Sequence, residues 1–464
     1  MKGKGWALFA VTAAVTIGTA MTSLAAEGWA KSGDNWVYYN ASGDLMRDTW
    51  RKGADGKWRY LDSSGEMAIN QWVDDEYYVD SNGIMVADKW LKIEADDNDN
   101  AVDGYIWYYL GSSGRMANDT WKKIDGKWYH FDDDGEMEIG WILDDMYYCG
   151  ANGVMQTGWQ KLYPPDSDEY EKDHVSPGDN DYDDDERKWF YLSANGKKYV
   201  PNSVSGEACD TKKIDGVNYC FNGYGEMQTG WTDMTGSDST LGNFSDYRYF
   251  GSDGKVKSGW LALEPPENVS GYEGEVEWFY FEKDGTPEIG PKNGEAVTSD
   301  IKTIKGKKYL FNELGTPVYG LRKVYLNKNS SEYTAYYFGK NRNNCSMEKG
   351  KQKIEEGDGT VSEFYFQDNG KGYTGPKDGY LYYMGKLQKP ESGAKYTIIS
   401  FPDGNGTKNY VVNKSGKLES NKTVKDEDGV KYTTGSNGVL QKIDGEKAEG
   451  GNYESVIEPE FEED

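Results

Sequence analysis

The chain has 464 residues, of which 36% are hydrophobic and 14% aromatic, with 37 Tyr, 16 Trp and 58 Gly. This composition excludes a fold built around one large aliphatic core and favours many short strands joined by glycine turns. The formal charge of -27 excludes nucleic acids and anionic membrane surfaces as simple electrostatic partners, which leaves neutral or cationic ligands.

Residues 1–26 have the pattern of a secretory signal. Lys2 and Lys4 precede an apolar run, and small residues surround Ala25 and Ala26, where we expect cleavage. An uncleaved membrane anchor is the alternative interpretation. No second apolar span follows in the sequence. We therefore predict a secreted protein, associated with the cell wall or cell surface, that makes no membrane contact after signal cleavage.

A repeat of 18 to 22 residues, lengthened in places by insertions, begins at residue 27. Each copy has one tryptophan at an equivalent position, which we term its closing tryptophan. Closing tryptophans occur at Trp29, Trp50, Trp72, Trp90, Trp121, Trp141, Trp159, Trp231 and Trp260. A second tryptophan stands seven residues before a glycine at Trp36, Trp58, Trp107, Trp128, Trp189 and Trp278. Two residues after the glycine of a repeat comes an apolar residue, which is methionine at Met67, Met85, Met116, Met137, Met155 and Met227. Such regular spacing indicates a repeat architecture.

Each repeat is predicted to contain a β-hairpin. The pair Asp125-Gly126 is the strongest short signal for a two-residue hairpin turn, because both central residues of that turn need positive φ. This turn sets Lys123 opposite Trp128 on one face, while Phe131 lies on the other. The same counting predicts three further opposed pairs, Trp121 with His130, Trp29 with Tyr38, and Trp141 with Tyr148.

The position of Phe131 has the character of a core position. In other repeats it is filled by Leu61, Val79, Leu110, Leu192, Phe221, Phe250, Phe281 and Phe311. A single two-stranded hairpin is marginal in water, so each repeat must bury this apolar face against its neighbours. We predict an all-β fold, a solenoid of stacked β-hairpin repeats of about 20 residues.

The rings on the other face, such as Trp121 and Trp128, have two possible roles. In the first, they pack against the next hairpin and bind no ligand. In the second, two rings of one hairpin and a third ring from a neighbour form an open box, with a methionine as its floor. Such a box suits a quaternary ammonium cation, whereas a flat row of rings suits a polysaccharide.

The segments EGWAKSGDNWVYYNASGDLM, KKIDGKWYHFDDDGEMEIGW and MYYCGANGVMQTGW resemble the choline-binding and glucan-binding repeats of Gram-positive surface proteins, the cell wall-binding repeat family. The chain is also similar to the carbohydrate-binding repeats that end large clostridial toxins, and the resemblance covers residues 28 to about 290. It implies a hairpin solenoid that binds a choline-bearing wall polymer or a glucan between consecutive hairpins. The site residues it implies are Trp29, Trp36, Trp50, Trp58, Trp90, Trp107, Trp121, Trp128, Met46, Met67 and Met137.

Some repeats depart from this pattern, and their boxes are expected to be incomplete. The repeats that begin at Trp72, Trp141 and Trp231 have Glu76, Met146 and either Asn218 or Tyr247 in place of the second tryptophan. No tryptophan follows Trp278, although the rhythm of strands and glycines continues. We predict Trp-rich cell wall-binding repeats over residues 27–290, degenerate hairpin repeats without tryptophan over 291–445, and an acidic disordered tail over 446–464.

Catalytic motifs are missing from the sequence. Two histidines are too few for His-dependent triads and most zinc sites, and neither G-x-S-x-G nor a phosphate-binding glycine loop occurs. The four cysteines show no metal spacing; we expect small buried residues, with a Cys209–Cys220 bridge as the alternative. We predict a binding protein that is not an enzyme, with no catalytic residue, metal site or cofactor. The competing hypotheses are a structural or host-contacting surface adhesin whose rings only pack, and a wall hydrolase without its catalytic domain.

Overall fold

The computed structural model describes residues 27–95, 101–165, 186–236, 244–292, 295–390, 394–404, 406–451 and 453–462. The predicted signal, residues 1–26, lies outside these ranges. The chain divides into two compact units, an N-terminal unit over Met1–Tyr199 and a C-terminal unit over Val200–Asp464. In the described ranges the regular elements are strands and three short 3-10 turns, so the fold is all-β. Nowhere in those ranges does a helix have the length and apolar character needed to cross a bilayer.

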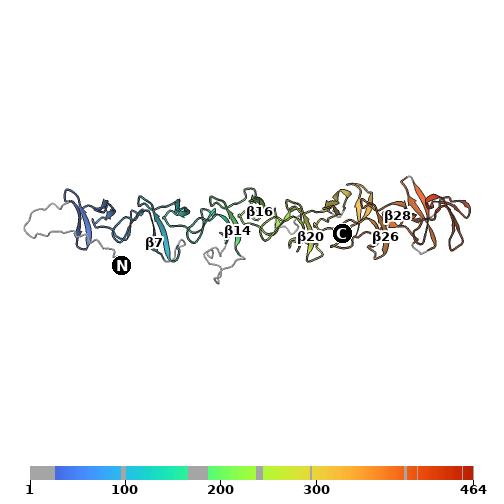
Figure 1. Cartoon of the computed structure of the whole chain (residues 1–464), viewed down its shortest axis with the longest axis horizontal. Helices are drawn as coiled ribbons and strands as arrows, with labels where there is room; N and C mark the ends of the chain where they lie inside the picture. Colours follow the sequence, from blue (N-terminus) through green and yellow to red (C-terminus); the bar gives the residue numbers. More distant parts are fainter. Residues whose placement is uncertain are drawn as a thin grey trace, which may run out of the picture. The chain divides into compact units, whose positions relative to one another are not determined.

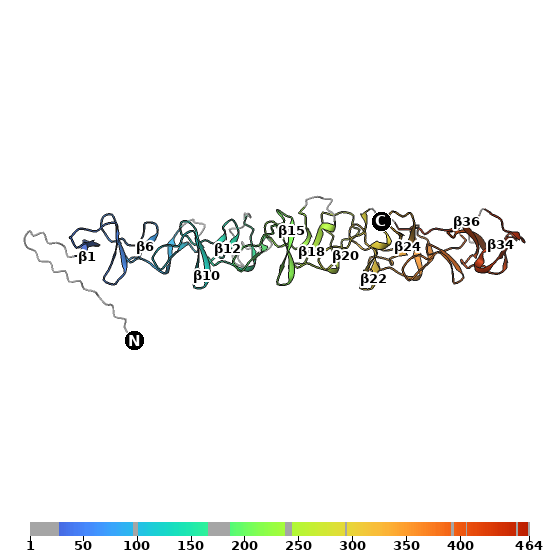
Figure 2. The same cartoon turned by 90° about the horizontal axis from the view of Figure 1, so that it is seen from above.

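The described part of the N-terminal unit forms seven antiparallel hairpins, each a two-stranded sheet. The hairpins follow one another in chain order (Figures 1 and 2). Their strands are β1 (Gly28–Ser32), β2 (Asn35–Tyr39), β3 (Thr49–Lys52), β4 (Trp58–Leu61), β5 (Gln71–Val73), β6 (Tyr77–Val79), β7 (Lys89–Glu94), β8 (Tyr105–Leu110), β9 (Thr120–Ile124), β10 (Lys127–Phe131), β11 (Gly140–Ile142), β12 (Tyr147–Cys149), β13 (Gly158–Leu162) and β14 (Lys188–Leu192).

The predicted register of the hairpins is confirmed. Between β9 and β10, Lys123 pairs with Trp128 and Trp121 pairs with His130. The turn residues Asp125 and Gly126 have φ values of 48° and 83°, as a two-residue turn with two left-handed residues requires. The other two predicted pairs are also present, Trp29 with Tyr38 and Trp141 with Tyr148.

The predicted core position is buried throughout. Its side chains are exposed by 2% or less at Leu61, Val79, Leu110, Phe131, Leu192, Phe221, Phe250, Phe281 and Phe311. Around Phe131 the core also contains Tyr109, Ile124 and Met137, with Trp90 packed at its edge. Each core is therefore shared by consecutive hairpins, which is how two-stranded sheets that are marginal alone become stable.

The methionine after each hairpin connects it to its neighbours on both sides. Met137 follows β10, and its amide donates a hydrogen bond to the Trp107 carbonyl of the preceding hairpin at 2.8 Å. Its side chain extends toward the hairpin that follows, where a Cβ on Gly153 (φ +72°) would lie only 2.2 Å from the Met137 sulfur. The recurrent glycine therefore provides both the left-handed turn and the space for this sulfur.

The C-terminal unit begins with further two-stranded hairpins and then changes to larger sheets. Its hairpin strands are β15 (Cys209–Ile214), β16 (Val217–Asn222), β17 (Gly230–Asp233), β18 (Tyr247–Phe250), β19 (Gly259–Leu263), β20 (Glu277–Phe281), β21 (Lys302–Ile304), β22 (Lys307–Tyr309), β23 (Leu321–Tyr325) and β24 (Tyr333–Tyr337). Its 3-10 turns are η2 (Phe244–Asp246), η4 (Thr298–Asp300) and η5 (Ser436–Gly438).

From β25 onward, the separate hairpins expected for residues 291–445 give way to sheets with more strands. A five-stranded sheet contains β25 (Gly350–Glu355), β26 (Val361–Phe366), β27 (Gly375–Lys377), β28 (Tyr380–Tyr383) and β29 (Lys386–Leu387). The strands of the remaining two sheets are β30 (Tyr396–Pro402), β31 (Thr407–Asn413) and β36 (Glu454–Ser455), then β32 (Thr423–Lys425), β33 (Lys431–Thr434), β34 (Leu440–Ile443) and β35 (Glu446–Lys447). The extra strand β29 forms because Met384 and Gly385, both with positive φ, return the chain directly beside β28.

The prediction of a disordered tail is wrong for residues 453–462. Strand β36 pairs in parallel with β30, and Val456 and Phe461 pack at the edges of two buried clusters. The acidic composition of the tail hid these apolar residues, which are widely spaced along the segment. The tail is therefore part of the folded C-terminal unit.

All four cysteines are buried as free thiols, so the alternative of a Cys209–Cys220 bridge is not formed in this structure. The expectation of small buried residues is confirmed. Burial raises the pKa of the Cys149 thiol to about 12, which keeps it protonated and unreactive.

The turn carboxylates create a testable pH dependence of stability. Burial raises the pKa of Asp132 from 3.8 to about 6, with repulsion from Glu136 and Glu138 adding to a shift that the Glu136 amide opposes. The folded state therefore binds the proton more tightly than the unfolded state, so stability from this group is greatest at low pH and is lost as pH rises through 6. We expect Asp132→Asn to raise the melting temperature at pH 7 and to reduce its fall between pH 4 and 7, measured by thermal denaturation.

Asp62 occupies the same turn position in another hairpin and provides a control of opposite sign. Burial alone would raise its pKa, but hydrogen bonds from the Ser64 hydroxyl and from the Glu66 and Ser64 amides outweigh burial and lower it. Stability from this group is present above the unfolded pKa and is lost as pH falls. Asp62→Asn should lower the melting temperature at pH 7. Equal effects of the two substitutions would contradict this assignment.

Candidate functional site: aromatic boxes between hairpins

The best-defined site lies between the hairpins β7–β8 and β9–β10. Trp90 and Trp107 come from opposite strands of the first hairpin, and their ring centroids are 6.2 Å apart with an interplanar angle of 81°. Tyr129 of the next hairpin lies 4.9 Å from Trp90 at 71°. Met137, exposed by only 4%, belongs to the same cluster. The three rings are partly exposed and pack against the buried cluster that contains Met137, so they remain accessible to solvent.

The orientation of these rings separates a box from a flat platform. Neighbouring planes that cross at 71° to 81° cannot present one continuous flat surface. Their exposed faces carry the negative potential that attracts a cation. These three rings therefore do not form the flat row predicted for a polysaccharide, and the cation box stays a prediction.

Part of this arrangement recurs in two other places in the N-terminal unit, where a closing tryptophan contacts a tyrosine of the next hairpin. Trp50 lies 5.5 Å from Tyr77 of the next hairpin, and Trp121 lies 5.2 Å from Tyr147. The second tryptophans of these repeats, Trp58 and Trp128, are each 41% exposed. Their carbonyls accept hydrogen bonds from the amides of Met85 and Met155, both at 2.9 Å. Near each of these tryptophan pairs there are therefore a tyrosine and a methionine from the repeat that follows.

The predicted pair Trp29 and Trp36 lacks the third ring. The position that Tyr129 occupies beside Trp90 is held here by Arg59, which pairs with Arg51 across the strands. The Arg59 guanidinium binds the Asp55 carboxylate through two hydrogen bonds of 2.9 Å. A fixed cation in this place disfavours a cationic ligand, so this pair does not form a box like that at Trp90.

Of the three predicted methionines, Met137 and Met67 are in the expected register and Met46 is not. The Met67 amide donates to the Trp36 carbonyl at 2.7 Å, as Met137 does to Trp107. Met46 instead bonds to Tyr38 of its own hairpin, and Leu45 makes the bridge equivalent to that of Met67. The predicted floor role of Met46 is therefore wrong by one residue, because the residue two places after the glycine is Leu45 and not the methionine beside it.

Several site residues were missed by sequence reasoning. The missed tyrosines and methionines are Tyr77, Tyr129, Tyr147, Met85 and Met155. In the C-terminal unit, Trp260, Trp278 and Tyr309 form a further ring group, with Trp260 lying 6.4 Å from Trp278 and 4.9 Å from Tyr309. The signal was present in three repeats, since Tyr77, Tyr129 and Tyr147 come directly before the residues that face Trp72, Trp121 and Trp141.

Known repeat families match the part of the chain that forms these sites. Two choline-binding repeat families match residues 26–72 and 66–94, and a cell wall binding repeat family matches residues 103–116 and 119–137. The chain carries choline-binding repeats. The matched segments contain all eight tryptophans predicted as site residues. In the described ranges, the choline-binding repeats are the antiparallel hairpins β1 to β10.

Individual proteins similar to this chain include several from streptococci. The chain is 26% identical over 333 residues to glucosyltransferase-S of Streptococcus mutans serotype c, a match that covers 69% of this chain and 19% of that enzyme. Similar solved structures include CbpJ of Streptococcus pneumoniae, at 20% identity over 69% of this chain and 99% of that chain with a TM-score of 0.39. The modular autolysin LytC of the same species matches at 21% identity over 63% of this chain and 52% of its own, with a TM-score of 0.36.

Two repeats of the N-terminal unit lack a complete box. In the repeat that begins at Trp72, Glu76 stands in place of the second tryptophan and pairs with Arg115. In the repeat that begins at Trp141, that ring is only 7% exposed and packs 4.9 Å from buried Phe190. In the first of these repeats an ion pair replaces the second tryptophan. In the other, the closing tryptophan is buried in the core.

Two of the second tryptophans, Trp58 and Trp128, lie close to cationic side chains of their own chain. The Lys52 ammonium lies 4.9 Å from the Trp58 ring centroid, and the Lys123 ammonium lies 5.8 Å from that of Trp128. Both distances are within the range of cation–π attraction, which extends to about 6 Å. The faces of Trp58 and Trp128 therefore already interact with ammonium groups of this chain.

Proposed function

We propose that this chain is a secreted, non-catalytic protein that attaches to the cell wall or cell surface by binding quaternary ammonium groups, such as choline, on wall polymers. The hairpins stack into a solenoid, and the boxes lie between consecutive hairpins. The ligand is held by two tryptophans of one hairpin, a tyrosine of the next and the methionine that follows it. The sites with this composition are centred on Trp50, Trp90 and Trp121.

The observation that carries this proposal is the near-perpendicular arrangement of Trp90, Trp107 and Tyr129, which pack against the buried cluster that contains Met137. A cation in contact with three rings gains about 0.5 to 2 kcal/mol from each. Part of that gain is offset by the translational and rotational freedom that the ligand loses. A millimolar dissociation constant corresponds to about -4.1 kcal/mol, so individual sites of this strength are expected to be weak.

The array compensates for weak individual sites. Several boxes on one chain can bind several choline groups of one polymer, and each binding event after the first is intramolecular. The net charge of -27 also favours a cationic group over an anionic one at long range. Retention at the wall therefore comes from the number of boxes and from charge, and it needs no covalent link.

Glucan binding is the second candidate. The match to glucosyltransferase-S favours it, since that match covers 69% of this chain. Rings that only pack the hairpins, as in a structural or host-contacting adhesin, are the third possibility, and the sealed Trp141 favours it for that repeat.

A fluorescence titration separates these functions. We expect choline and tetramethylammonium to change tryptophan emission with saturation in the millimolar range, while ethanolamine, which lacks the quaternary centre, and soluble dextran cause no change. A response to dextran alone would favour a glucan, and no response to any of them would favour packing. Incubation of the protein with purified cell walls tests the non-catalytic assignment, which released sugars or peptides would contradict.

A further inference from the structure

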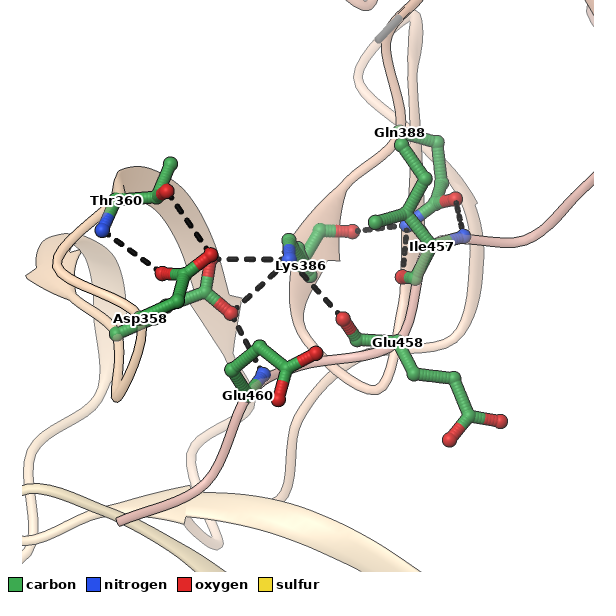
Figure 3. A network of polar contacts seen from close by, with 8 residues as sticks. Asp358, Thr360, Lys386, Gln388, Ile457, Glu458 and Glu460 are labelled. Atoms are coloured by element: carbon green, nitrogen blue, oxygen red, sulfur yellow. Dashed lines mark hydrogen bonds and ion pairs between the residues drawn. The ribbon is translucent and has the colours of Figure 1, made fainter.

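The C-terminal segment, residues 454–462, lies along a surface of the C-terminal unit that we term the groove, and it is held there mainly through its main chain (Figure 3). The groove is formed by residues of β23, β24 and β29 and by the turn between β25 and β26. Segment and groove are more than 65 residues apart in the sequence. The contacts are specific for an extended peptide, as the following details show.

The Gln388 side chain makes two hydrogen bonds to the main chain of Ile457, as a neighbouring strand would. It is completely buried, with 0% exposure. Its Nε2 donates to the Ile457 carbonyl at 2.9 Å, and its Oε1 accepts from the Ile457 amide at 2.7 Å (Figure 3). The Nε2 also donates to the Lys386 carbonyl at 3.1 Å, so without the segment the buried Oε1 is the atom that loses its donor, which is costly.

A buried ion pair beside Gln388 is completed by the same segment. Lys386 lies 3.0 Å from both carboxylate oxygens of Glu356, whose side chain has no exposed surface. The Lys386 ammonium also donates to the Glu458 carbonyl at 3.0 Å, and Glu356 Oε2 accepts from the Glu460 amide at 2.8 Å (Figure 3). Both charges therefore have a main-chain partner in the segment, which reduces the penalty of burying them.

Side chains of the segment add apolar and polar anchors at fixed spacing. Phe461 packs against Tyr333 with ring centroids 6.1 Å apart, and the Tyr333 hydroxyl donates to the Glu458 carboxylate at 3.1 Å. Pro459 is buried, and a proline restricts the residue before it to extended conformations. The segment is thus partly ordered for binding before it enters the groove.

We propose that this groove is a peptide-binding site and that residues 454–462 are its built-in, exchangeable ligand. Its ligand class is an extended acidic peptide with apolar residues five positions apart, as at Val456 and Phe461. The exposed pair Gly450-Gly451 connects the ligand to the preceding strand. Glycines lack the side chains that restrict the backbone, so this link allows the segment to leave the groove and return.

The test uses the full chain with a protease site placed between Gly450 and Gly451 and cut after folding. We expect the released segment to remain bound and to be replaced by a labelled synthetic peptide of residues 453–464, one per chain, as measured by fluorescence polarisation. Gln388→Ala should weaken peptide binding at least tenfold. A peptide with proline in place of Ile457, which lacks the recognised amide, should fail to compete.

The matched control is Gln352→Ala, because Gln352 is also on a strand edge but bonds only to the exposed Lys349 carbonyl near it. Near-UV circular dichroism of each cut chain shows whether a variant is folded before peptide is added. Absence of peptide exchange in the cut chain, or equal affinities in the Gln388 and Gln352 variants, would overturn the proposal. If Gln388→Ala does not fold, the proline peptide on the unmodified cut chain decides, since its equal competition would overturn the proposal too.

Discussion

Replacing Trp90 with alanine should remove one choline site from the chain and lower the free energy of unfolding of its hairpins by about 3 kcal/mol. Removal of a large aromatic side chain from a packed position typically costs about 3 to 5 kcal/mol, and Trp90 is at the lower end because it is partly exposed. The ring contacts four others, at Trp107, Tyr109, Tyr129 and Phe131. Calorimetric titration with choline should give one bound ligand fewer per chain, and urea denaturation should give the loss of stability.

Trp72→Ala is the matched control for this experiment. Trp72 also packs against two tyrosines, Tyr78 at 5.4 Å and Tyr108 at 5.0 Å, but its repeat has Glu76 in place of the second tryptophan. We expect a comparable loss of stability and an unchanged number of bound cholines. If both variants lose a ligand, or if neither does, the box at Trp90 is not a binding site.

Lys386→Met should destabilise the C-terminal unit by about 3 to 5 kcal/mol, the usual result of removing one partner of a buried ion pair. The substitution leaves the Glu356 carboxylate buried with only the Glu460 amide as a donor. Its other oxygen is held by the lysine charge alone, since it receives no hydrogen bond. Urea denaturation followed by tyrosine-sensitive circular dichroism measures the loss.

The double variant Lys386→Met with Glu356→Gln separates the charge from the packing. With the carboxylate neutralised, no buried charge is left unpaired, so a large part of the lost stability should return. A double variant as unstable as the sum of its two single variants would show that the two side chains act independently. In that case the ion pair does not stabilise the groove.

Local rules were sufficient to predict the hairpins and their cores. Asp125-Gly126 defines the turn, the turn defines which residues face each other, and alternation then assigns Phe131 to the buried face. Every step of this reasoning stays within one repeat. It is therefore independent of how one hairpin lies on the next.

The composition of the box depends on contacts between hairpins, and these were not predictable in the same way. Tyr129 belongs to the face that was assigned to the core of its own hairpin, yet it forms a wall for Trp90 of the preceding one. The place of Arg59 beside the first tryptophan pair follows from the same offset. Face assignments within one hairpin could not show this, because a box combines the tryptophan face of one hairpin with the opposite face of the next.

The order of the tail is a long-range effect of another kind. Overall acidity predicted disorder, but Gln388 and Lys386 provide partners that only the folded groove brings together. Average composition over a segment carries no information about such partners. Single apolar residues at the correct spacing, Val456 and Phe461, were enough to fix the segment once the groove existed.

Met137 connects three successive hairpins, and contacts of this kind limit how the gene can change in length. Since Met137 bonds backward to Trp107 and fills the space under Gly153 ahead of it, each junction is made of the same parts as the one before. In-frame duplication or deletion of one whole copy that carries a box keeps junctions of this kind in phase and alters the number of boxes by one. Insertion of half a copy would break two junctions, so recombination between copies in phase is the tolerated route to stronger or weaker wall attachment.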